Sequence, residues 1–440
     1  MGEFRQIWRN RWVKFSLASV IYILIFVVWT GNPWMLLGLP IIYDIYISKF
    51  IYRFFWRRHL EIKTKNRTYK VAADWIEAII FAVVVTTIIR VLIFALYVIP
   101  TPSMEKTLLV GDYLLVSKLA YGPVVPNTPI AFPLVHNTMP FSQTKRSYVE
   151  WLSWPYHRMK GWGGVQRGDV VVFNFPAGDT VLLKNQQVTY YDVLRRYRFN
   201  YGPEEGYRRL HRESPVIYRP VDKRENYVKR CVGIPGDSIE IKAAQLLVNG
   251  KPLDDIPGLQ FEFKAIYKTG VVDTMFMLVN DAHKHGKHPN VLDISMVVER
   301  RVDMNAFPHD TLYSWNRDFY GPVWVPKKGA TVELTRQTIP FYRDIIGKYE
   351  GNDLEERDGV IYINGELAES YTFKMDYFFM MGDNRHNSAD SRFWGFVPED
   401  HVVGKASFVW FSTDKDRTWL SFEKIRWNRL FRSVETLQNR

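Results

Sequence analysis

The sequence predicts a membrane protein in two parts: N-terminal transmembrane helices, followed by a mainly β extracytoplasmic domain with large insertions. Three observations support this prediction. Apolar stretches occupy most of the first hundred of the 440 residues, and basic residues crowd the ends of these stretches. Beyond residue 105, short strand-like runs alternate with Gly, Pro and Asn turn signals.

The apolar stretches number three, and about 20 apolar residues suffice to cross a bilayer. The middle one contains Asp44 and Lys49, so an interfacial helix is an alternative to a membrane span. The last one is the strongest candidate, although Glu77 and Arg90 interrupt it. We expect these two charges to pair with lipid headgroups or neighbouring helices. The stretches are Phe15–Thr30, Trp34–Phe54 and Trp75–Ile99.

The positive charge indicates how the chain crosses the membrane. Residues 1–70 hold twelve Lys and Arg against three acidic residues, and thus most of the net charge of +12. Basic residues near helix ends mark the cytoplasmic side. We therefore expect a hairpin of two crossings, a basic cytoplasmic loop near 53–70, and a third crossing that places everything after about residue 100 outside. No basic stripe interleaved with aromatic residues follows, which argues against nucleic acid as a partner.

Several strands and turns stand out in the exported part. The run 169–175 is apolar enough to be a buried strand, and 239–242 alternates. Asn-Gly pairs at 249–250 and 364–365 lie between strand-like residues, and Asn-Gly is the strongest short signal for a hairpin. The sequence thus predicts two tight hairpins in this domain.

A serine and a lysine are the candidates for chemistry. Ser103 lies just after the last apolar stretch, where a membrane helix would meet water. A serine hydroxyl needs a base, and Lys229 can act as one only when burial lowers its pKa. In a strand, Lys229 would share a face with Tyr227 and Cys231, while Arg230 points away. From spacing alone, a structural salt bridge for Lys229 is the favoured interpretation.

A third cluster, 380–395, changes that balance. It is a polar loop after an apolar run and reads Met-Met-Gly-Asp-Asn-Arg-His-Asn-Ser-Ala-Asp-Ser-Arg-Phe-Trp-Gly. Together with the segments 99–108, 167–173 and 227–237, it resembles the boxes of bacterial type I signal peptidases (leader peptidases), in the order of that family and after a membrane segment. One box alone would be a weak signal, but four in order are specific.

The resemblance implies a role for each matching residue. Ser103 would be the nucleophile, with Lys229 as the general base and later the general acid. Ser388 would orient the lysine amine, and the Thr101 hydroxyl and Ser103 amide would form the oxyanion hole. The site would be braced by the charged residues Arg230, Asp383, Asp390 and Arg392. Shallow pockets for small side chains would be lined by Ile99, Leu108, Tyr227 and Val228.

The resemblance also implies substrate, partners and location. The substrates would be preproteins whose signal peptides end in an Ala-x-Ala site, bound as an added β-strand. The other partners would be the lipid bilayer and, functionally, the export translocase. The chain would be a multi-pass protein of the bacterial inner membrane, with a periplasmic catalytic domain. Neither a metal nor a cofactor is expected.

On this basis the chain divides into a membrane region, a catalytic core in two parts, and insertions of polar, irregular sequence. The exported core should be a coiled antiparallel arrangement. The C-terminal tail could lie on the membrane surface or be an ordinary packed helix. The ranges are 1–99 for the membrane region, 100–254 for the first part of the core with an insertion at about 178–225, 255–356 for an inserted second lobe, 357–412 for the second part of the core, and 413–440 for the basic, aromatic tail.

Some residues depart from the family or stand outside it. Pro102 and Lys106 replace a commoner glycine and proline, and His386 replaces a frequent aspartate. The histidines at 283, 285 and 288 are interpreted as a solvated turn rather than a metal site. The aromatic residues between 151 and 162 could dip into a membrane or pack in the core. Cys231 is the single cysteine, so no intrachain disulfide can form.

Two other functions are kept as alternatives. One is a self-cleaving Ser–Lys protease of the kind that controls repressors, although three membrane segments argue against it. The other is a non-catalytic envelope receptor or assembly factor with the same fold. The presence of Ser103, Lys229 and Ser388 argues against the second.

Overall fold

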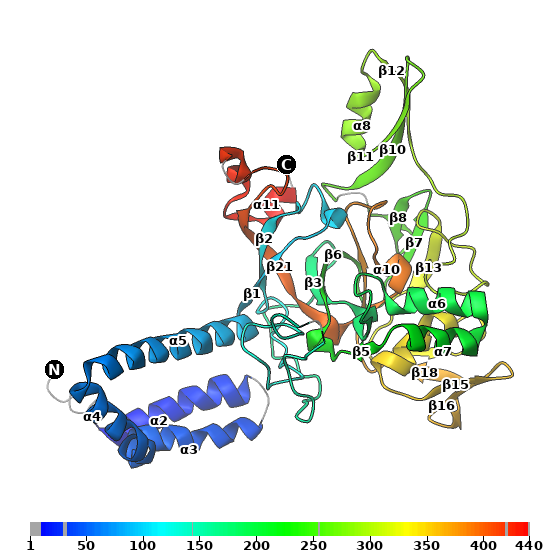
Figure 1. Cartoon of the computed structure of the whole chain (residues 1–440). Helices are drawn as coiled ribbons and strands as arrows, with labels where there is room; N and C mark the ends of the chain where they lie inside the picture. The colour runs from blue at the N-terminus through cyan, green and yellow to red at the C-terminus, as the bar shows by residue number, and fades with distance from the viewer. Residues whose placement is uncertain (1–9, 30–32, 143, 254–255, 419–420, 439–440) are drawn as a thin grey trace.

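The structure is a computed structural model that describes residues 10–29, 33–142, 144–253, 256–418 and 421–438. Figure 1 shows a group of N-terminal helices on one side and a larger, mainly β domain on the other, joined through the end of helix α5.

The membrane part holds two helical segments that are long and apolar enough to cross a bilayer, Arg11–Val28 and Arg67–Leu92. Between them, Met35–Ser48 and Tyr52–Lys65 meet at a bend of 61°, and this pair would make a third span if it counts as one. In Figure 1 helices α2 and α3 run alongside each other before α5 leads to the domain. The elements are α2 (Arg11–Tyr22), η1 (Ile23–Val28), η2 (Pro33–Gly38), α3 (Leu39–Tyr43), η3 (Asp44–Ser48), η4 (Tyr52–Trp56), α4 (Arg57–Lys65) and α5 (Arg67–Leu92).

The two charged residues of the predicted middle stretch, Asp44 and Lys49, stabilise the bend between its two helical segments. Lys49 adopts a left-handed conformation with φ of 54°. The carboxylate of Asp44 accepts hydrogen bonds from the backbone amides of Phe50 (2.6 Å) and Ile51 (3.1 Å). Asp44 therefore satisfies amides that the break in the helix leaves free.

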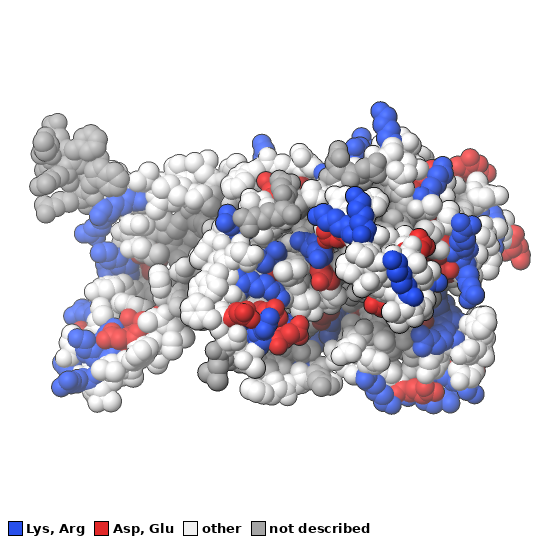
Figure 2. Space-filling view, turned by 90° about the horizontal axis from the view of Figure 1, so that it is seen from above, with Lys and Arg blue, Asp and Glu red and all other residues white. Residues whose placement is uncertain are grey.

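Glu77 pairs with a neighbouring helix, which is one of the two partners expected for it from the sequence; the other was a lipid headgroup. Its carboxylate lies 2.8 Å from Lys63 Nζ and 2.8 Å from His59 Nε2, both on α4. Figure 2 shows Lys and Arg gathered at the end of the helical part that lies away from the β domain, with mostly uncharged surface between. This arrangement matches a basic surface at one side of a bilayer.

The prediction that Trp75–Ile99 forms one apolar segment of the membrane region was wrong at its end. Helix α5 stops at Leu92, and β1 (Phe94–Val98) pairs antiparallel with β2 (Asp112–Ser117). An apolar run does not by itself distinguish a helix from a strand, and here pairing with β2 decides the outcome. The β domain therefore begins before residue 100.

The main sheet has eight strands in the order β1-β2-β21-β3-β6-β19-β20, with β22 beside β21, and its pairings are antiparallel. The predicted buried strand 169–175 is confirmed as β3, since all five of its residues are buried. One face of the sheet packs on a core that includes Leu114, Val170 and Val409. The remaining strands are β3 (Val170–Asn174), β6 (Asn226–Gly233), β19 (Tyr377–Met381), β20 (Val397–Pro398), β21 (Val402–Ser412) and β22 (Arg432–Ser433).

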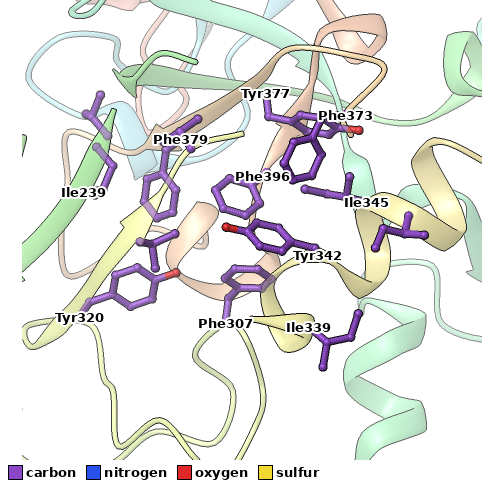
Figure 3. Packing of buried hydrophobic residues seen from close by; sticks show 14 of the residues in the cluster. Ile239, Phe307, Tyr320, Ile339, Tyr342, Ile345, Phe373, Tyr377, Phe379 and Phe396 are labelled. Atoms are coloured by element: carbon purple, nitrogen blue, oxygen red, sulfur yellow. The ribbon is translucent and has the colours of Figure 1, made fainter. Parts of the chain in front are cut away.

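The expectation of one separate inserted lobe at 255–356 was wrong. Strand β13 (Tyr320–Trp324) pairs with β7 (Ser238–Lys242), which the sequence assigned to the first part of the core. Figure 3 shows that Phe307, Tyr342 and Ile345 from the insertion pack against Phe379 and Phe396. This second half of the insertion is thus part of the same hydrophobic core. The cause is burial: aromatic side chains within a polar, irregular sequence reach the core through long-range contacts that periodicity cannot reveal.

Only the first half of this insertion projects from the domain. Strand β10 (Gln260–Tyr267) pairs with β11 (Val272–Leu278) and with β12 (Val291–Met296), and α8 (Val279–Gly286) packs on them. Figure 1 shows this unit extending away from the main sheet, and we call it the arm (260–296). His283 and His285 lie on α8 rather than in the predicted turn, and His285 contacts the hydroxyl of Tyr267.

The insertion at 178–225 is also ordered. Helices α6 (Tyr190–Tyr201) and α7 (Pro203–Glu213) form a hairpin with its own small core around Leu194 and Leu210. Strands β4 (Thr180–Leu182) and β5 (Val216–Tyr218) close its base. The polar composition therefore marks surface helices rather than irregular chain.

Both predicted Asn-Gly hairpins are confirmed. Strand β8 (Gln245–Val248) turns into β9 (Lys251–Pro252), and β16 (Val360–Ile363) turns into β17 (Glu366–Leu367). Asn249 and Asn364 have φ near +50°, and the glycine after each is also positive, as a two-residue hairpin turn requires.

The described part of the basic, aromatic tail forms two 3₁₀ turns and a short strand with Phe422 and Trp427 exposed, rather than the packed helix of one alternative, and only its last described residues are helical. Helix α11 (Val434–Gln438) places Val434 and Leu437 in the core beneath the main sheet. Ahead of it, the guanidinium of Arg429 binds the buried carboxylate of Asp112 at 2.6 Å. The alternative that the tail lies on a membrane surface stays a prediction.

Candidate active site

Ser103 lies on a short connection between the first two strands of the main sheet. Strand β1 ends at Val98, the 3₁₀ turn η5 (Pro102–Met104) follows, and the chain returns into β2. Backbone bonds from Ile99 to Asp112 (2.9 Å) and from Gly111 to Ile99 (2.9 Å) close the loop. The Ser103 side chain is thus held at one end of the sheet, and the residue is 8% exposed.

Lys229 reaches Ser103 from the middle of the sheet. It lies on β6, opposite Val171 of β3, and is 3% exposed. Its Nζ lies 2.6 Å from the Oγ of Ser103. The amine also lies 5.7 Å from the centre of the Tyr227 ring, in keeping with the shared strand face expected from the sequence. Two residues 126 positions apart therefore form a hydrogen-bonded pair.

Burial sets the basicity of this amine. The pKa of Lys229 is lowered from 10.5 to about 8: removal from water is the main cause, Asp390 and Asp383 oppose it, and nearby Arg392 adds to it. A pKa of about 8 leaves a useful fraction of neutral amine near neutral pH. An amine in this state can accept the proton of a serine hydroxyl.

Arg230 and Asp383 form a buried pair beside the lysine. The guanidinium binds both carboxylate oxygens, at 2.7 and 2.5 Å, and also donates to the carbonyl of Gly168 at 2.6 Å. Thr107, which the sequence reasoning did not select, donates to Asp383 at 2.6 Å. The pair connects β6 with the chain after β19 and with the loop that follows Ser103.

Asp390 and Arg392 form a second buried pair. The guanidinium binds the two carboxylate oxygens at 2.8 Å each. Asp390 also caps the short helix α10 (Ser391–Trp394) and accepts from the Gly382 amide at 3.1 Å. The other guanidinium contacts go to the carbonyls of Arg317 and Arg385, so this pair holds a loop in place.

Two residues of the 382–392 loop contact the serine segment directly. The amide of Asn384 donates to the carbonyl of Ser103 at 3.1 Å, and its side chain donates to the carbonyl of Pro102 at 3.3 Å. A Cβ atom on Gly382 would lie 2.6 Å from the Ser103 carbonyl oxygen and 2.2 Å from the Ser388 Oγ. Both residues belong to the 380–395 cluster, but the sequence predicts no role for either. The only sequence feature that marks Gly382 and Asn384 is their position on either side of Asp383.

Ser388 lies beside this contact without bonding to the lysine. Its hydroxyl donates to the carbonyl of Ala389 at 3.3 Å, and no hydrogen bond joins it to Lys229 within the described part of the chain. The Thr101 hydroxyl lies 3.5 Å from the Ser103 Oγ, at the limit of a hydrogen bond. The structure thus brings both residues near Ser103, and their predicted roles remain proposals.

The residues predicted to line substrate pockets fall into two groups. Ile99 and Leu108 are buried in one core cluster, with Val228 packed against it. Tyr227 points to the other face of the sheet, where its ring stacks on Phe175 at 4.4 Å. Val228 and Tyr227 thus face opposite sides of the sheet, because neighbours on a strand alternate, and the pocket roles of the four residues stay proposals.

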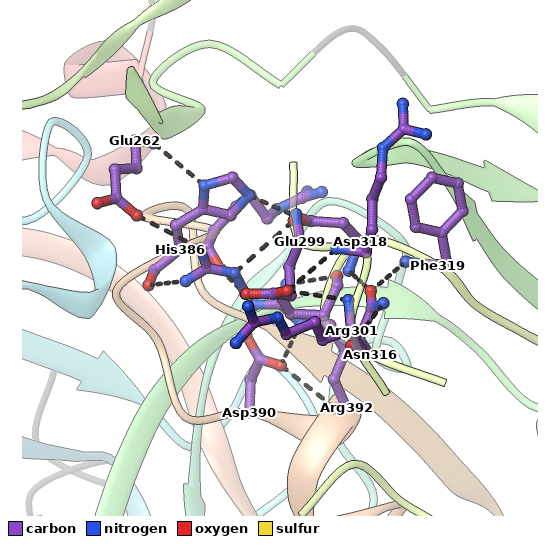
Figure 4. Close-up of polar contacts among 12 residues, drawn as sticks. Glu262, Glu299, Arg301, Asn316, Asp318, Phe319, His386, Asp390 and Arg392 are labelled. Carbon is purple, nitrogen blue, oxygen red and sulfur yellow. Dashed lines mark hydrogen bonds and ion pairs between the residues drawn. The ribbon is translucent and has the colours of Figure 1, made fainter. Parts of the chain in front are cut away.

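His386 connects the insertion to the same loop. Figure 4 shows its ring between the arm and Asp318: Nδ1 accepts from the Glu262 amide at 3.2 Å, and Nε2 lies 2.8 Å from Asp318 Oδ1. Burial alone would raise the pKa of Asp318, but hydrogen bonds from His386 and the Glu299 amide hold it below its usual value. The histidine that replaces a frequent aspartate thus has a structural partner within the insertion.

Comparison with known proteins agrees with this geometry. The sequence profile of the family described as "Signal peptidase, peptidase S26" matches residues 72–269 and 367–411, which is more than half of the chain. The chain belongs to this family. It is accordingly a serine peptidase, and thus a hydrolase. The matched residues include both members of the hydrogen-bonded Ser103–Lys229 pair.

Curated relatives extend the similarity over most of the chain. Signal peptidase I of Haemophilus influenzae is 26% identical over 383 residues, covering 85% of this chain and 79% of that protein. Signal peptidase I of Buchnera aphidicola subsp. Acyrthosiphon pisum is 25% identical and covers 93% and 97%. Signal peptidase I of Helicobacter pylori (strain J99) is 24% identical and covers 86% and 97%. Together with the apolar N-terminal helices, these relatives indicate a membrane-anchored peptidase of the signal peptidase I type that removes signal peptides.

Proposed function

We propose that the chain removes signal peptides at Ala-x-Ala sites with a Ser103–Lys229 dyad, as a multi-pass protein of the bacterial inner membrane. The observation that carries the proposal is the 2.6 Å contact between a serine hydroxyl and a buried lysine amine. The four family boxes, which lie far apart in the sequence, converge on this contact through the bonds of Arg230, Asp383 and Asn384.

The chemistry follows from the state of the amine. Neutral Lys229 takes the hydroxyl proton as the Oγ of Ser103 attacks the scissile carbonyl, and the ammonium then protonates the departing amine. The acyl-enzyme is hydrolysed by water, which the same amine activates. The Ser103 amide and the Thr101 hydroxyl would stabilise the developing oxyanion. Ser388 would orient the amine after a rotation of its side chain.

The membrane places substrate and serine in one compartment. Helix α5 ends at Leu92, β1 runs from Phe94 to Val98, and Ser103 lies in the turn that follows this strand. A signal peptide crossing the same bilayer would therefore present its cleavage site close to the serine, at a high effective concentration. We infer that the catalytic domain lies on the periplasmic side, where the translocase delivers preproteins.

Cleavage of a purified preprotein tests the proposal. The full-length protein in detergent should release the signal peptide from a substrate with an Ala-x-Ala site, and Ser103→Ala or Lys229→Ala should abolish release while near-ultraviolet circular dichroism stays unchanged. Lys268→Ala, an exposed lysine on the arm, is the matched control and should retain activity.

The outcomes separate the alternatives. Cleavage that survives Lys229→Ala would contradict the dyad. A folded wild type that binds preproteins without cleaving them would favour the receptor. A substrate in which both alanines are replaced by bulky residues should resist cleavage, and equal cleavage would contradict the Ala-x-Ala preference.

A further inference from the structure

The junction between the membrane helices and the β domain contains a basic cavity. It has a volume of about 220 Å³ and lies between the end of α5, the start of β1 and the loop 124–136. Arg90, Lys118 and Lys223 line it together with His136. Three lysine and arginine side chains thus line a cavity at the end of α5, the helix that is expected to span the membrane.

Two of these cations have no partner. Among the described residues, neither Arg90 nor Lys118 forms a side-chain hydrogen bond or an ion pair. Lys223 differs, since its Nζ lies 3.8 Å from Asp222. Burial, and to a lesser extent the charges of Arg90 and Arg158, lower the pKa of Lys118 from 10.5 to about 8. An anion bound here would relieve that repulsion.

The two acidic residues that line the cavity are already engaged. The Asp222 carboxylate accepts from the Thr128 hydroxyl at 2.7 Å, and Asp400 lies 2.6 Å from the His401 ring. Neither is bonded to Arg90 or Lys118. The positive charges of Arg90 and Lys118 are therefore available to a ligand.

A second cavity of about 220 Å³ adjoins the first and has only apolar surface. It lies between the first helix, α5 and the domain, and its walls include Phe26, Trp29, Ile88 and Trp154. Thr87, Val91 and Pro126 line both cavities. The Thr87 hydroxyl is buried and has no hydrogen-bond partner. The basic cavity and the apolar cavity thus share a wall, and that wall holds an unsatisfied hydroxyl.

The surroundings match the surface of a bilayer. Apolar side chains on the loops beside the junction are unusually exposed: Phe132 by 52%, Leu134 by 53%, Trp151 by 79% and Trp162 by 81%. Exposed tryptophan is favoured where hydrocarbon meets water. The junction therefore lies at headgroup depth if α5 spans the membrane.

We propose that this junction binds one anionic phospholipid, with its phosphate between Arg90 and Lys118 and an acyl chain in the adjoining apolar cavity. Phosphate oxygens accept strong charge-assisted hydrogen bonds from Arg and Lys side chains, and a free phosphate ion would accept the same bonds. The apolar cavity favours the lipid, because a free ion would leave it unfilled. Such a lipid would fix the β domain against the membrane, which is a binding function separate from peptide cleavage.

Lipid retention and thermal unfolding test the proposal with the full-length protein. Native mass spectrometry should show one phosphatidylglycerol retained by wild type and none by Arg90→Gln/Lys118→Gln. The control Lys268→Gln/Lys287→Gln removes two exposed arm charges and should retain the lipid. After delipidation, micelles with phosphatidylglycerol should raise the Tm of wild type and of the control, but not that of the site variant.

Three outcomes would overturn the proposal. Undiminished retention by the site variant would exclude the two cations as the binding groups. An equal Tm increase with phosphatidylcholine would indicate general insertion into lipid. An increase with inorganic phosphate alone would indicate a free ion. Val91→Trp, which adds bulk to a wall that both cavities share, should also abolish retention, and a folded Val91→Trp protein that keeps its lipid would contradict the assignment of the acyl chain. None of these readouts depends on cleavage.

Discussion

At the scale of single residues, the central feature is a lysine held in an unfavourable environment. Lys229 is removed from water, and its amine contacts a serine hydroxyl rather than a carboxylate. Two ion pairs lie near it, but their carboxylates bind Arg230 and Arg392. The protein thus keeps negative charge close without a direct salt bridge, so that desolvation determines the pKa.

This environment predicts a cost in stability. The folded pKa of about 8 lies below the unfolded value of 10.5, so the penalty is full below pH 8 and disappears as pH rises towards 10.5. Lys229→Met should raise the free energy of unfolding at pH 7 by up to roughly 3 kcal/mol, because one pKa unit is about 1.4 kcal/mol. Denaturant unfolding across pH measures this gain.

The control for that prediction is Lys268→Met, an exposed change that should leave the pH dependence as in wild type. A gain for Lys229→Met that stays constant between pH 7 and 11 would show that the stabilisation does not come from the amine's protonation.

Gly382 predicts a steric effect on activity. A Cβ atom there would lie 2.6 Å from the backbone carbonyl of Ser103, which cannot yield as a flexible side chain can. Gly382→Ala should lower kcat by roughly 10- to 100-fold, since a shift of about 1 Å at a reacting group has effects of this size. Gly164→Ala, where no atom lies within 4 Å, should cleave at the wild-type rate. Equal rates for both variants would argue against this contact.

At the scale of elements, the sequence predicted the features that depend only on neighbouring residues, such as hairpin turns. Asn-Gly predicted both hairpins, because few other residues accept positive φ at both turn positions. The end of α5 was missed, because β1 is as apolar as the helix before it. The aromatic residues of the second insertion were missed as core, since their partners lie far away in sequence.

The candidate site divides in the same way. The resemblance identified Ser103, Lys229 and the paired residues Arg230 and Asp383, and the structure places them in contact. The role of Asn384 could not be predicted, because both its backbone amide and its side chain donate to backbone carbonyls of the serine segment, which lies far away in the sequence. Ser388 illustrates the opposite case, since a rotamer determines which atom it contacts and no sequence pattern encodes that choice.

The connection between the insertion and the 382–392 loop predicts a loss of stability. Asp318 is 1% exposed and binds both His386 and the Glu299 amide. Asp318→Ala should reduce the free energy of unfolding by roughly 3 kcal/mol, because it leaves a buried partner unpaired. Asp273→Ala on the exposed face of the arm should change it by less than about 0.5 kcal/mol. A similar small change for both would mean that the insertion does not hold the loop through this pair.

At the scale of the whole molecule, the helices meet the β domain at the junction beside the end of α5. The indole of Trp29 donates to the carbonyl of Lys160 at 3.0 Å, and β1 continues from α5. A hairpin of two crossings followed by α5 would place α4 and the β domain on opposite sides of the bilayer.

Labelling of introduced cysteines checks this topology. Cys231 is fully buried, so wild type offers little background. A membrane-impermeant maleimide added to spheroplasts should label Lys145→Cys in the β domain at once. It should label Arg58→Cys on α4 only after the membrane is permeabilised. Immediate labelling of both would contradict the predicted crossings.

The central claim is that a buried amine activates Ser103, and the pH dependence of cleavage tests it most directly. The measurement is kcat/KM for a model preprotein from pH 5 to 10, which reports the ionisation of the free enzyme. The account predicts a rate that rises with pH and levels off above about pH 8, where Lys229 becomes neutral, and no cleavage by Lys229→Ala at any pH. A rate independent of pH across this range, or a Lys229→Ala variant with the same profile, would contradict it.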